Sequence, residues 1–308
     1  MLQLRGVVGT PVTPFTDTGE LDRATLEKLV AFLVDTKIDA LALPMHIGES
    51  LNLTNPERKQ LAEIAVATVA GEIPVLVNVS LAGTDEVIDL ARHSERVGAN
   101  GVIVTAPYHW QPPKEALIEH FLAVGRSVEI GLVAYNYPAR FGVEVSTEIV
   151  AELIGRLDNF IGLKDASFNM EYHTELCRVT RELRPSFSNF TGVEYVLPSI
   201  VVGGSGCFSA HGGVAPVLVR RLYDACAAGA LEEALQLQHE FSHLYKFLQV
   251  PYPATIKAAM GLMGRPVGGT RRPLQNLSAE AVETLAERLR EFAILEHEPQ
   301  GWEMQVRA

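Results

Sequence analysis

Short β-rich runs alternate with longer amphipathic stretches along most of this chain, and this alternation is typical of a parallel sheet with crossover helices. Several of the short runs, such as residues 101–105, are almost wholly apolar, as strands covered on both faces should be. The predicted strands are residues 6–12, 38–43, 74–79, 101–105, 130–135, 159–164, 186–190 and 205–209. Eight such units favour an α/β fold of the (β/α)₈ TIM-barrel type.

Each predicted strand is followed by a helical pattern, and one of these patterns opens with a strong start signal. Thr54-Asn55-Pro56-Glu57 has the residue types of a capping box with proline in the first turn. The predicted helices are residues 22–36, 55–70, 84–98, 114–127, 146–156, 171–183, 194–201 and 214–228, then 231–248, 253–263 and 278–294. Because the last three follow one another without strands, we expect a barrel with the catalytic site over residues 1–229 and a C-terminal helical extension over residues 230–308.

Composition narrows the choice of partners and compartment. A net charge of -11, with no dense Lys/Arg block, opposes binding to nucleic acid or to an anionic membrane. Cys177, Cys207 and Cys226 form no CxxC pair, which favours free thiols in a reducing compartment. The N-terminus does not resemble a signal peptide, and no apolar run approaches the roughly 20 residues needed to cross a bilayer. We expect a cytoplasmic protein without nucleic-acid or membrane partners.

Lys164 is the most unusual residue in the predicted barrel. The catalytic residues of a (β/α)₈ barrel lie at the C-terminal ends of its strands, and Lys164 ends the run Phe160-Ile161-Gly162-Leu163-Lys164-Asp165, which should be buried. Burial lowers the pKa of a lysine, and the neutral amine is the form that attacks a ketone. Taken alone, Lys164 is explained equally well by a pair with Asp165 or by a side chain that reaches out to the barrel mouth.

Three further features lie at the same end of the predicted barrel. Tyr135 ends the strand next to that of Lys164, so its phenol is placed to move a proton, although a packed aromatic is the simpler interpretation of Tyr135 alone. Arg140, in the loop that follows, can form a bidentate pair with a carboxylate. Gly48-Glu49-Ser50 lies between a strand and a helix, where its backbone N–H groups can face an anion.

Together with other motifs in the same order, these features show that the chain resembles the dihydrodipicolinate synthase/N-acetylneuraminate lyase family over roughly its full length. The matching segments are Thr13-Pro14-Phe15, Gly48-Glu49-Ser50, Tyr135-Asn136-Tyr137-Pro138, Gly162-Leu163-Lys164-Asp165 and Gly203-Gly204-Ser205-Gly206-Cys207-Phe208-Ser209. The resemblance implies a class I mechanism, in which Lys164 condenses with a 2-oxo carbon and the protonated imine acts as the electron sink. It also implies a homotetramer, built as a dimer of dimers.

The resemblance assigns roles to individual residues. Tyr135 would be the general acid/base, and the backbone around Ile47 and Gly48, with Glu49 beside them, would hold the substrate carboxylate. Arg140 matches the arginine that binds the carboxylate of the aldehyde substrate in the synthase. Phe208 belongs to the last matching segment and is expected at the substrate site.

The chain departs from the synthase pattern on both sides of the expected pocket. His46 and Ile47 stand where the pattern has two threonines, and His109 stands where it has a second tyrosine. Because imidazole titrates near neutrality, both histidines are candidate catalytic residues, although either can instead be a hydrogen-bonding residue of the pocket wall. A metal held by His46, His109, His211 and Glu49 is a weaker alternative, since no HxxxH spacing is present and the lysine already explains the electrophile.

The sequence therefore predicts a Schiff-base-forming lyase that acts on pyruvate or another small 2-oxo acid by aldol cleavage or condensation, with no cofactor and no metal. One alternative is a dehydratase or deaminase of a sugar-derived or hydroxyproline-derived 2-oxo acid. Another is a non-catalytic 2-oxo-acid-binding protein of the same fold. The presence of both Lys164 and Tyr135 argues against this last alternative, because binding alone requires neither.

Overall fold

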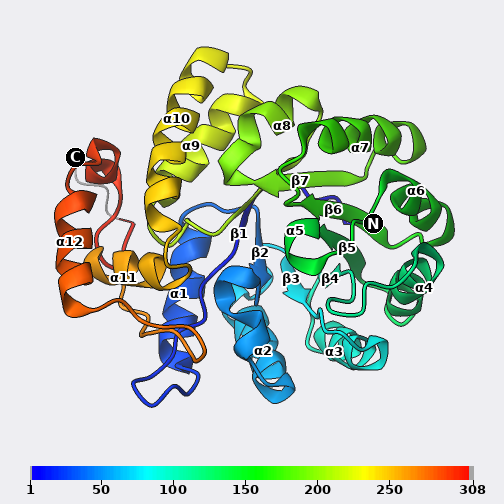
Figure 1. The fold of residues 1–308 in the computed structure, drawn as a ribbon, viewed down its shortest axis with the longest axis horizontal. Helices are drawn as coiled ribbons and strands as arrows, with labels where there is room; N and C mark the ends of the chain where they lie inside the picture. Colours follow the sequence, from blue (N-terminus) through cyan, green and yellow to red (C-terminus); the bar gives the residue numbers. More distant parts are fainter. Residues whose placement is uncertain (1, 305–308) are drawn as a thin grey trace.

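The chain forms a closed barrel of eight parallel strands surrounded by helices, as predicted (Figure 1). The computed structural model describes residues 2–304. Every predicted strand is present, and neighbouring strands follow one another in sequence order around the barrel. The strands are β1 (Gly6–Gly9), β2 (Ala40–Leu43), β3 (Val75–Asn78), β4 (Gly101–Thr105), β5 (Gly131–Asn136), β6 (Phe160–Asp165), β7 (Ser188–Gly192) and β8 (Gly206–Ser209).

The predicted helices are also present, and most of their ends lie within two residues of the prediction. The barrel helices are α1 (Arg23–Asp35), α2 (Asn55–Val69), α3 (Thr84–Arg96), α4 (Lys114–Gly125), α6 (Thr147–Arg156), α7 (Met170–Leu183), α8 (Val196–Val202) and α9 (Pro216–Ala227). The capping box of α2 is formed, because the Thr54 and Glu57 side chains each bind the other's backbone N–H. The sequence did not predict the short helix α5 (Pro138–Phe141) or the 3₁₀ turns η1 (His46–Gly48), η2 (Ser50–Asn52), η3 (Val193–Tyr195) and η4 (Ala293–His297).

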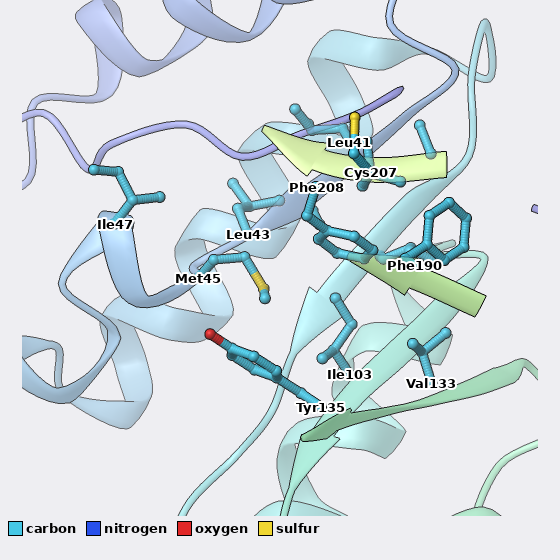
Figure 2. Close-up of a cluster of buried hydrophobic side chains, with 14 of the residues drawn as sticks. Leu41, Leu43, Met45, Ile47, Ile103, Val133, Tyr135, Phe190, Cys207 and Phe208 are labelled. Carbon is cyan, nitrogen blue, oxygen red and sulfur yellow. The ribbon is translucent and has the colours of Figure 1, made fainter. Parts of the chain in front are cut away.

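The barrel closes between β1 and β8, where two glycines bring the backbones close together. Gly6 pairs with Gly206, and a Cβ atom on Gly206 would lie 1.9 Å from the carbonyl oxygen of Gly6. Glycine is therefore required at position 206. Inside the barrel, apolar side chains from successive strands fill the space (Figure 2), and Phe190 and Phe208 meet edge to face at 5.4 Å. The interior of the barrel is therefore a packed core.

The C-terminal extension packs against one side of the barrel. It consists of α10 (Leu231–Leu248), α11 (Ala254–Leu262) and α12 (Ala279–Leu289), drawn from yellow to red in Figure 1. Helix α10 contacts α8 and α9, and α11 contacts α10 and α12. Among residues 2–304 no helix is both long and apolar enough to cross a membrane.

Candidate active site

A cavity of about 100 Å³ opens at the C-terminal ends of the strands, where the fold leads one to expect the active site. Its walls come from the C-terminal ends of β1, β2, β5, β6, β7 and β8 and the segments that follow them, and from the C-terminal extension. The lining residues are Thr10, Met45, His46, Ile47, Tyr135, Tyr137, Arg140, Lys164, Ala166, Phe168, Gly192, Glu194, Phe208, Ala210, His211, Tyr245, Gln249 and Tyr252. The site is therefore not confined to residues 1–229.

Lys164 projects into this cavity from the end of β6 and is 9% exposed. Within residues 2–304 its amine has no hydrogen-bond or ion-pair partner, and Nζ lies 4.1 Å from the centroid of the Tyr135 ring. Burial lowers the pKa of Lys164 to about 8, although Glu194 and Asp165 oppose this shift. A substantial fraction of the amine is thus neutral near physiological pH, which is the form that a nucleophile needs.

Asp165 is not the ionic partner of Lys164, because adjacent residues of a strand point to opposite faces. The fully buried Asp165 carboxylate instead accepts hydrogen bonds from the Asn136 amide at 3.0 Å and from both the backbone N–H and the hydroxyl of Ser167 at 3.0 Å. These contacts fix the end of β6 on the face of the strand opposite Lys164. The alternative in which Lys164 is only one half of a structural ion pair with Asp165 is therefore wrong.

Tyr135 lies beside Lys164, as the strand order predicted. The two residues are register partners on β5 and β6. The Tyr135 ring packs against Tyr137 at 6.1 Å and Phe141 at 5.7 Å, and Figure 2 shows its hydroxyl directed toward Met45 and Ile47, away from Val133. Burial raises the pKa of Tyr135 well above its ordinary value, so the free enzyme holds the phenol in its protonated form. In this state the Tyr135 hydroxyl can donate a hydrogen bond to a group bound in the cavity.

His46 lies in the cavity wall, where its ring stacks on Tyr252 at 5.7 Å. Burial, together with the positive charges of Arg140 and Lys164, lowers the pKa of His46 to about 4. Its imidazole is therefore neutral at physiological pH. In this state His46 can accept a proton or donate a hydrogen bond from its neutral N–H. It is a poor general acid, because it carries no readily transferable proton.

His109 lies outside the cavity lining, although the sequence placed it at the same barrel end. Its backbone has a positive φ of 78°, its side chain is exposed, and its ring meets Trp110 edge to face at 5.1 Å. His211 does line the cavity, but it is buried beneath Tyr245 and Phe241. The three histidines and Glu49 do not converge, and the part of the chain that is described holds no group of three His, Cys, Asp or Glu arranged around a common metal position.

The segment after β2 forms the 3₁₀ turn η1 rather than an open loop. The N–H of Gly48 donates to the carbonyl of Met45 at 3.0 Å, and the N–H of Glu49 donates to the carbonyl of His46 at 3.1 Å. Those two N–H groups are thus used within the turn. The N–H groups of His46 and Ile47, at its start, are the ones left to face a ligand. The Thr13 hydroxyl secures the turn by donating to the Gly48 carbonyl at 2.6 Å.

The remaining predicted binding residues fall on different sides of the cavity. Arg140 lies on α5 at the exposed rim, where a hydrogen bond to Tyr137 raises the pKa of its guanidinium. Phe208 lines the floor from β8 and is 5% exposed. The Glu49 side chain faces away from the cavity and pairs with Lys257. Glu49 therefore does not line the cavity as Ile47 does, although the sequence grouped it with the substrate-binding residues.

Several lining residues were missed by the sequence analysis. Glu194 follows Thr191-Gly192 at the end of β7, so the rule that located Lys164 could have found it. Burial raises the pKa of Glu194, while the charge of Lys164 and a hydrogen bond from Tyr245 lower it. Tyr245, Gln249 and Tyr252 come from the extension, and nothing in their local sequence indicates a place in the site.

A buried amine without an ionic partner, set beside a protonated phenol at the mouth of a TIM barrel, defines a Schiff-base-forming lyase of the class I aldolase type. Comparison with known proteins agrees with this class. The chain belongs to the dihydrodipicolinate synthetase family, whose model matches residues 3–292.

Individual relatives resemble the chain over nearly its whole length. The 4-hydroxy-tetrahydrodipicolinate synthase of Methanococcoides burtonii is 33% identical, covering 94% of this chain and 99% of that protein. YagE, a prophage protein of E. coli K12 solved in complex with pyruvate, is 27% identical with a TM-score of 0.90, covering 94% and 99% of the two chains. A monomeric dihydrodipicolinate synthase variant is 32% identical with a TM-score of 0.89, covering 94% and 97%.

Proposed function

We propose that this enzyme forms a Schiff base between Lys164 and pyruvate or another short 2-oxo acid. The neutral Lys164 amine adds to the C2 carbonyl, and loss of water from the carbinolamine gives the protonated imine. Loss of a proton, or cleavage of the carbon–carbon bond at C3, sends an electron pair into the imine and forms the enamine. Tyr135 supplies and takes up the protons that these steps exchange.

The position of Lys164 is the observation that carries this proposal. A lysine that merely packed or paired would have an anionic partner or would reach water, whereas this amine has a lowered pKa and faces a phenol. The pyruvate bound in YagE and the synthase activity in the name of the M. burtonii relative support the same chemistry.

The cavity favours a short substrate. Pockets for drug-sized ligands are roughly 300–1,000 Å³, so a space of about 100 Å³ suits an acid of a few carbons better than a long sugar acid. We place the 2-oxo acid carboxylate against the N–H groups of His46 and Ile47, opposite Lys164. Arg140, at the rim, would then receive a second anionic group of a larger substrate or of a condensation partner.

A dehydratase or deaminase is the second candidate, and the altered wall of the cavity favours it over the dihydrodipicolinate synthase reaction. His46 and Ile47, which line the cavity, replace two hydroxyl residues of the synthase pattern, whereas His109, which replaces a third, lies outside the cavity wall. Glu194 lines the same cavity as Lys164 and is a carboxyl group that could transfer a proton to a leaving hydroxyl or amine. In this reaction the enamine would expel a substituent at C4.

We also propose a homotetramer, assembled as a dimer of dimers, that works in the cytoplasm. Trp110 and Leu51 are 71% and 59% exposed, and these are large apolar side chains that a second subunit would cover in such an assembly. The three buried free cysteines suit a reducing compartment. Sedimentation analysis of the purified chain tests the assembly, and a monomer, the state named for one of the solved structures, would contradict it.

Borohydride reduction tests the proposed chemistry directly. The protein is incubated with each of a panel of 2-oxo acids, reduced, and weighed intact by mass spectrometry. Pyruvate should add one covalent adduct, which peptide mapping locates at Lys164, and Lys164→Ala should prevent it. No adduct with any 2-oxo acid would contradict the proposed function and favour a binding protein. Product analysis separates the reactions, since pyruvate release indicates aldol cleavage, while ammonia or a semialdehyde indicates elimination.

A further inference from the structure

A second lysine, Lys257 on α11, is buried as deeply as Lys164 but has no place in the proposed chemistry. It is 3% exposed. Its Nζ lies 2.8 Å from Oε1 of Glu49 and donates to the Gly269 carbonyl at 2.6 Å. The Phe15 ring covers the same amine, with 4.5 Å between Nζ and the ring centroid. Lys257 thus has two polar partners close to its amine, and the charged one, Glu49, comes from the barrel rather than from the extension.

Glu49 is held from several directions at once. Its Oε2 accepts hydrogen bonds from the backbone N–H of Arg271 at 2.9 Å and from the Asn52 amide at 3.3 Å, in addition to the Lys257 pair. Its backbone has a positive φ of 54°, a conformation that non-glycine residues rarely adopt without support. The contacts of the side chain therefore fix a strained backbone position.

That backbone position borders directly on the cavity. Glu49 immediately follows η1, and the residues just before it, Met45, His46 and Ile47, all line the cavity. A shift of Glu49 would carry the turn with it, because the N–H of Glu49 is bonded to the His46 carbonyl at 3.1 Å. The extension therefore contacts this turn through the buried Glu49–Lys257 ion pair, in addition to the Arg271 N–H on Glu49 and the ring of Tyr252 stacked on His46.

Stability alone does not explain this pair. Both side chains are almost completely withdrawn from water, at 2% and 0% exposed, and replacing such a pair with apolar residues is often neutral or stabilising. An ion pair is, however, far more selective about geometry than an apolar contact. The segment after α11 also packs closely against Phe15, the residue whose ring covers Lys257. A Cβ atom on Gly268 would lie 1.9 Å from the Phe15 carbonyl oxygen.

We propose that Lys257 is a positioning residue, which acts through Glu49 to hold the η1 turn where it receives the carboxylate of the 2-oxo acid. The inference rests on the proposed function, because it assumes that this turn is the carboxylate side of the site. Lys257 touches neither the substrate nor the amine of Lys164. Its loss should therefore weaken substrate binding while leaving the capacity to form the imine intact.

The test is borohydride labelling of Lys164 across a range of pyruvate concentrations, with Lys257→Met compared to wild type. We expect the half-saturating pyruvate concentration to rise by about tenfold to a hundredfold, as for other losses of positioning. Labelling at saturating pyruvate should still reach the wild-type extent. In steady-state assays the same variant should show a raised KM with little change in kcat.

Two further variants separate positioning from folding. Lys257→Met/Glu49→Gln removes both charges, so no unpaired carboxylate is left buried, and it should recover stability while keeping the raised half-saturating concentration. Arg265→Met is the matched control, because Arg265 is a fully buried cation of the extension that binds the carbonyls of Gly213 and Pro299 instead of the turn. It should lower stability without changing the half-saturating concentration.

Each result has a separate meaning. Folded Lys257 variants with the wild-type half-saturating concentration contradict the inference and leave the proposed function standing. An equal rise of the half-saturating pyruvate concentration in Arg265→Met also contradicts the inference, because the loss of any buried cation of the extension would then weaken binding. If neither Lys257 variant folds, the pair is structural and the inference is wrong. If no 2-oxo acid labels the wild type, the proposed function fails, and the inference that rests on it fails too.

Discussion

The end of β6 and the middle of α11 each bury a lysine over the face of an aromatic ring, and the two lysines have opposite surroundings. Lys164 lies 4.1 Å from the centroid of the Tyr135 ring, and Lys257 lies 4.5 Å from that of Phe15. Burial lowers the pKa of both amines. Only Lys257 also has a carboxylate and a carbonyl within hydrogen-bonding distance.

This difference shows that burial does not by itself make a lysine a nucleophile. The partners of Lys257 favour its charged form and occupy the amine, whereas Lys164 has an open cavity in front of it. The rings differ as well, since Tyr135 carries a hydroxyl that can move a proton and Phe15 does not. One lysine is available for chemistry, and the other is fixed in place.

The largest expected effect is on Lys164 itself. Lys164→Arg should reduce turnover to the background level, because a guanidinium stays protonated at any usable pH and cannot add to a ketone. Steady-state assays on the best substrate of the panel measure this loss. Measurable turnover in the purified variant would show that Lys164 is not the nucleophile, and Lys164 would then not differ from Lys257 in this respect.

The next difference to test is the hydroxyl of Tyr135 beside Lys164, because Phe15 beside Lys257 has none. Tyr135→Phe keeps the ring face under the amine and makes it resemble the Phe15 environment. We expect turnover to fall by roughly 10²–10⁴, the usual contribution of a positioned acid/base. Borohydride labelling at long incubation should still reach Lys164. If kcat stays near the wild-type value, another group moves the proton, and Glu194 is the first to examine.

Replacing Lys164 and replacing Lys257 should change the free energy of unfolding in opposite directions. Lys257→Met leaves the Glu49 charge unpaired and should destabilise the protein by about 3–5 kcal/mol. Lys164→Met removes an amine whose folded pKa, about 8, is below its unfolded value of 10.5, and it should stabilise the protein by roughly 1–3 kcal/mol. This gain should be complete below pH 8 and disappear as the pH rises toward 10.5. Urea unfolding at pH 7 and pH 10 measures both, and destabilisation by Lys164→Met would contradict the comparison.

The two histidines should differ in a similar way, because only His46 reaches the cavity. We expect His46→Phe to lower turnover about tenfold, since a neutral imidazole contributes less than a full general acid. His109→Phe should have a smaller effect, and both variants should label normally with borohydride. A larger effect at His109 would mean that its loop reaches the site in the assembled enzyme.

The smallest effect concerns the pH at which Lys164 reacts. The initial rate of labelling should rise with pH through about 8, as the amine of Lys164 becomes neutral. Because the charge of Glu194 raises the pKa of Lys164, Glu194→Gln should move this profile to lower pH by less than about one unit. An unchanged profile would show that Glu194 is uncharged near pH 8.

The features that could be predicted from the sequence are those fixed by short stretches of chain. The apolar runs located all eight strands, and strand ends located Lys164 and Tyr135. The same rule placed His109 at this end of the barrel, but its side chain is exposed and does not line the cavity. Glu194 was within reach of the rule and was overlooked.

The contributions of the extension could not be predicted in this way. Tyr252 and Lys257 lie in a helical region whose pattern indicates only that it packs somewhere on the barrel. Their roles depend on where the extension docks, which involves contacts with residues about 200 positions earlier in the chain, such as Glu49. Local patterns carry no information about such a distance.

The order in which the chain is synthesised gives this arrangement a further consequence. A nascent chain has produced Lys164 and Tyr135 well before it reaches Tyr245, Tyr252 and Lys257, which complete the cavity wall and brace the η1 turn. A chain that ends between these two groups of residues contains the Lys164 amine but lacks part of the proposed binding wall for a 2-oxo acid. Affinity for a 2-oxo acid is therefore expected only after Tyr245, Tyr252 and Lys257 have been synthesised and packed on the barrel.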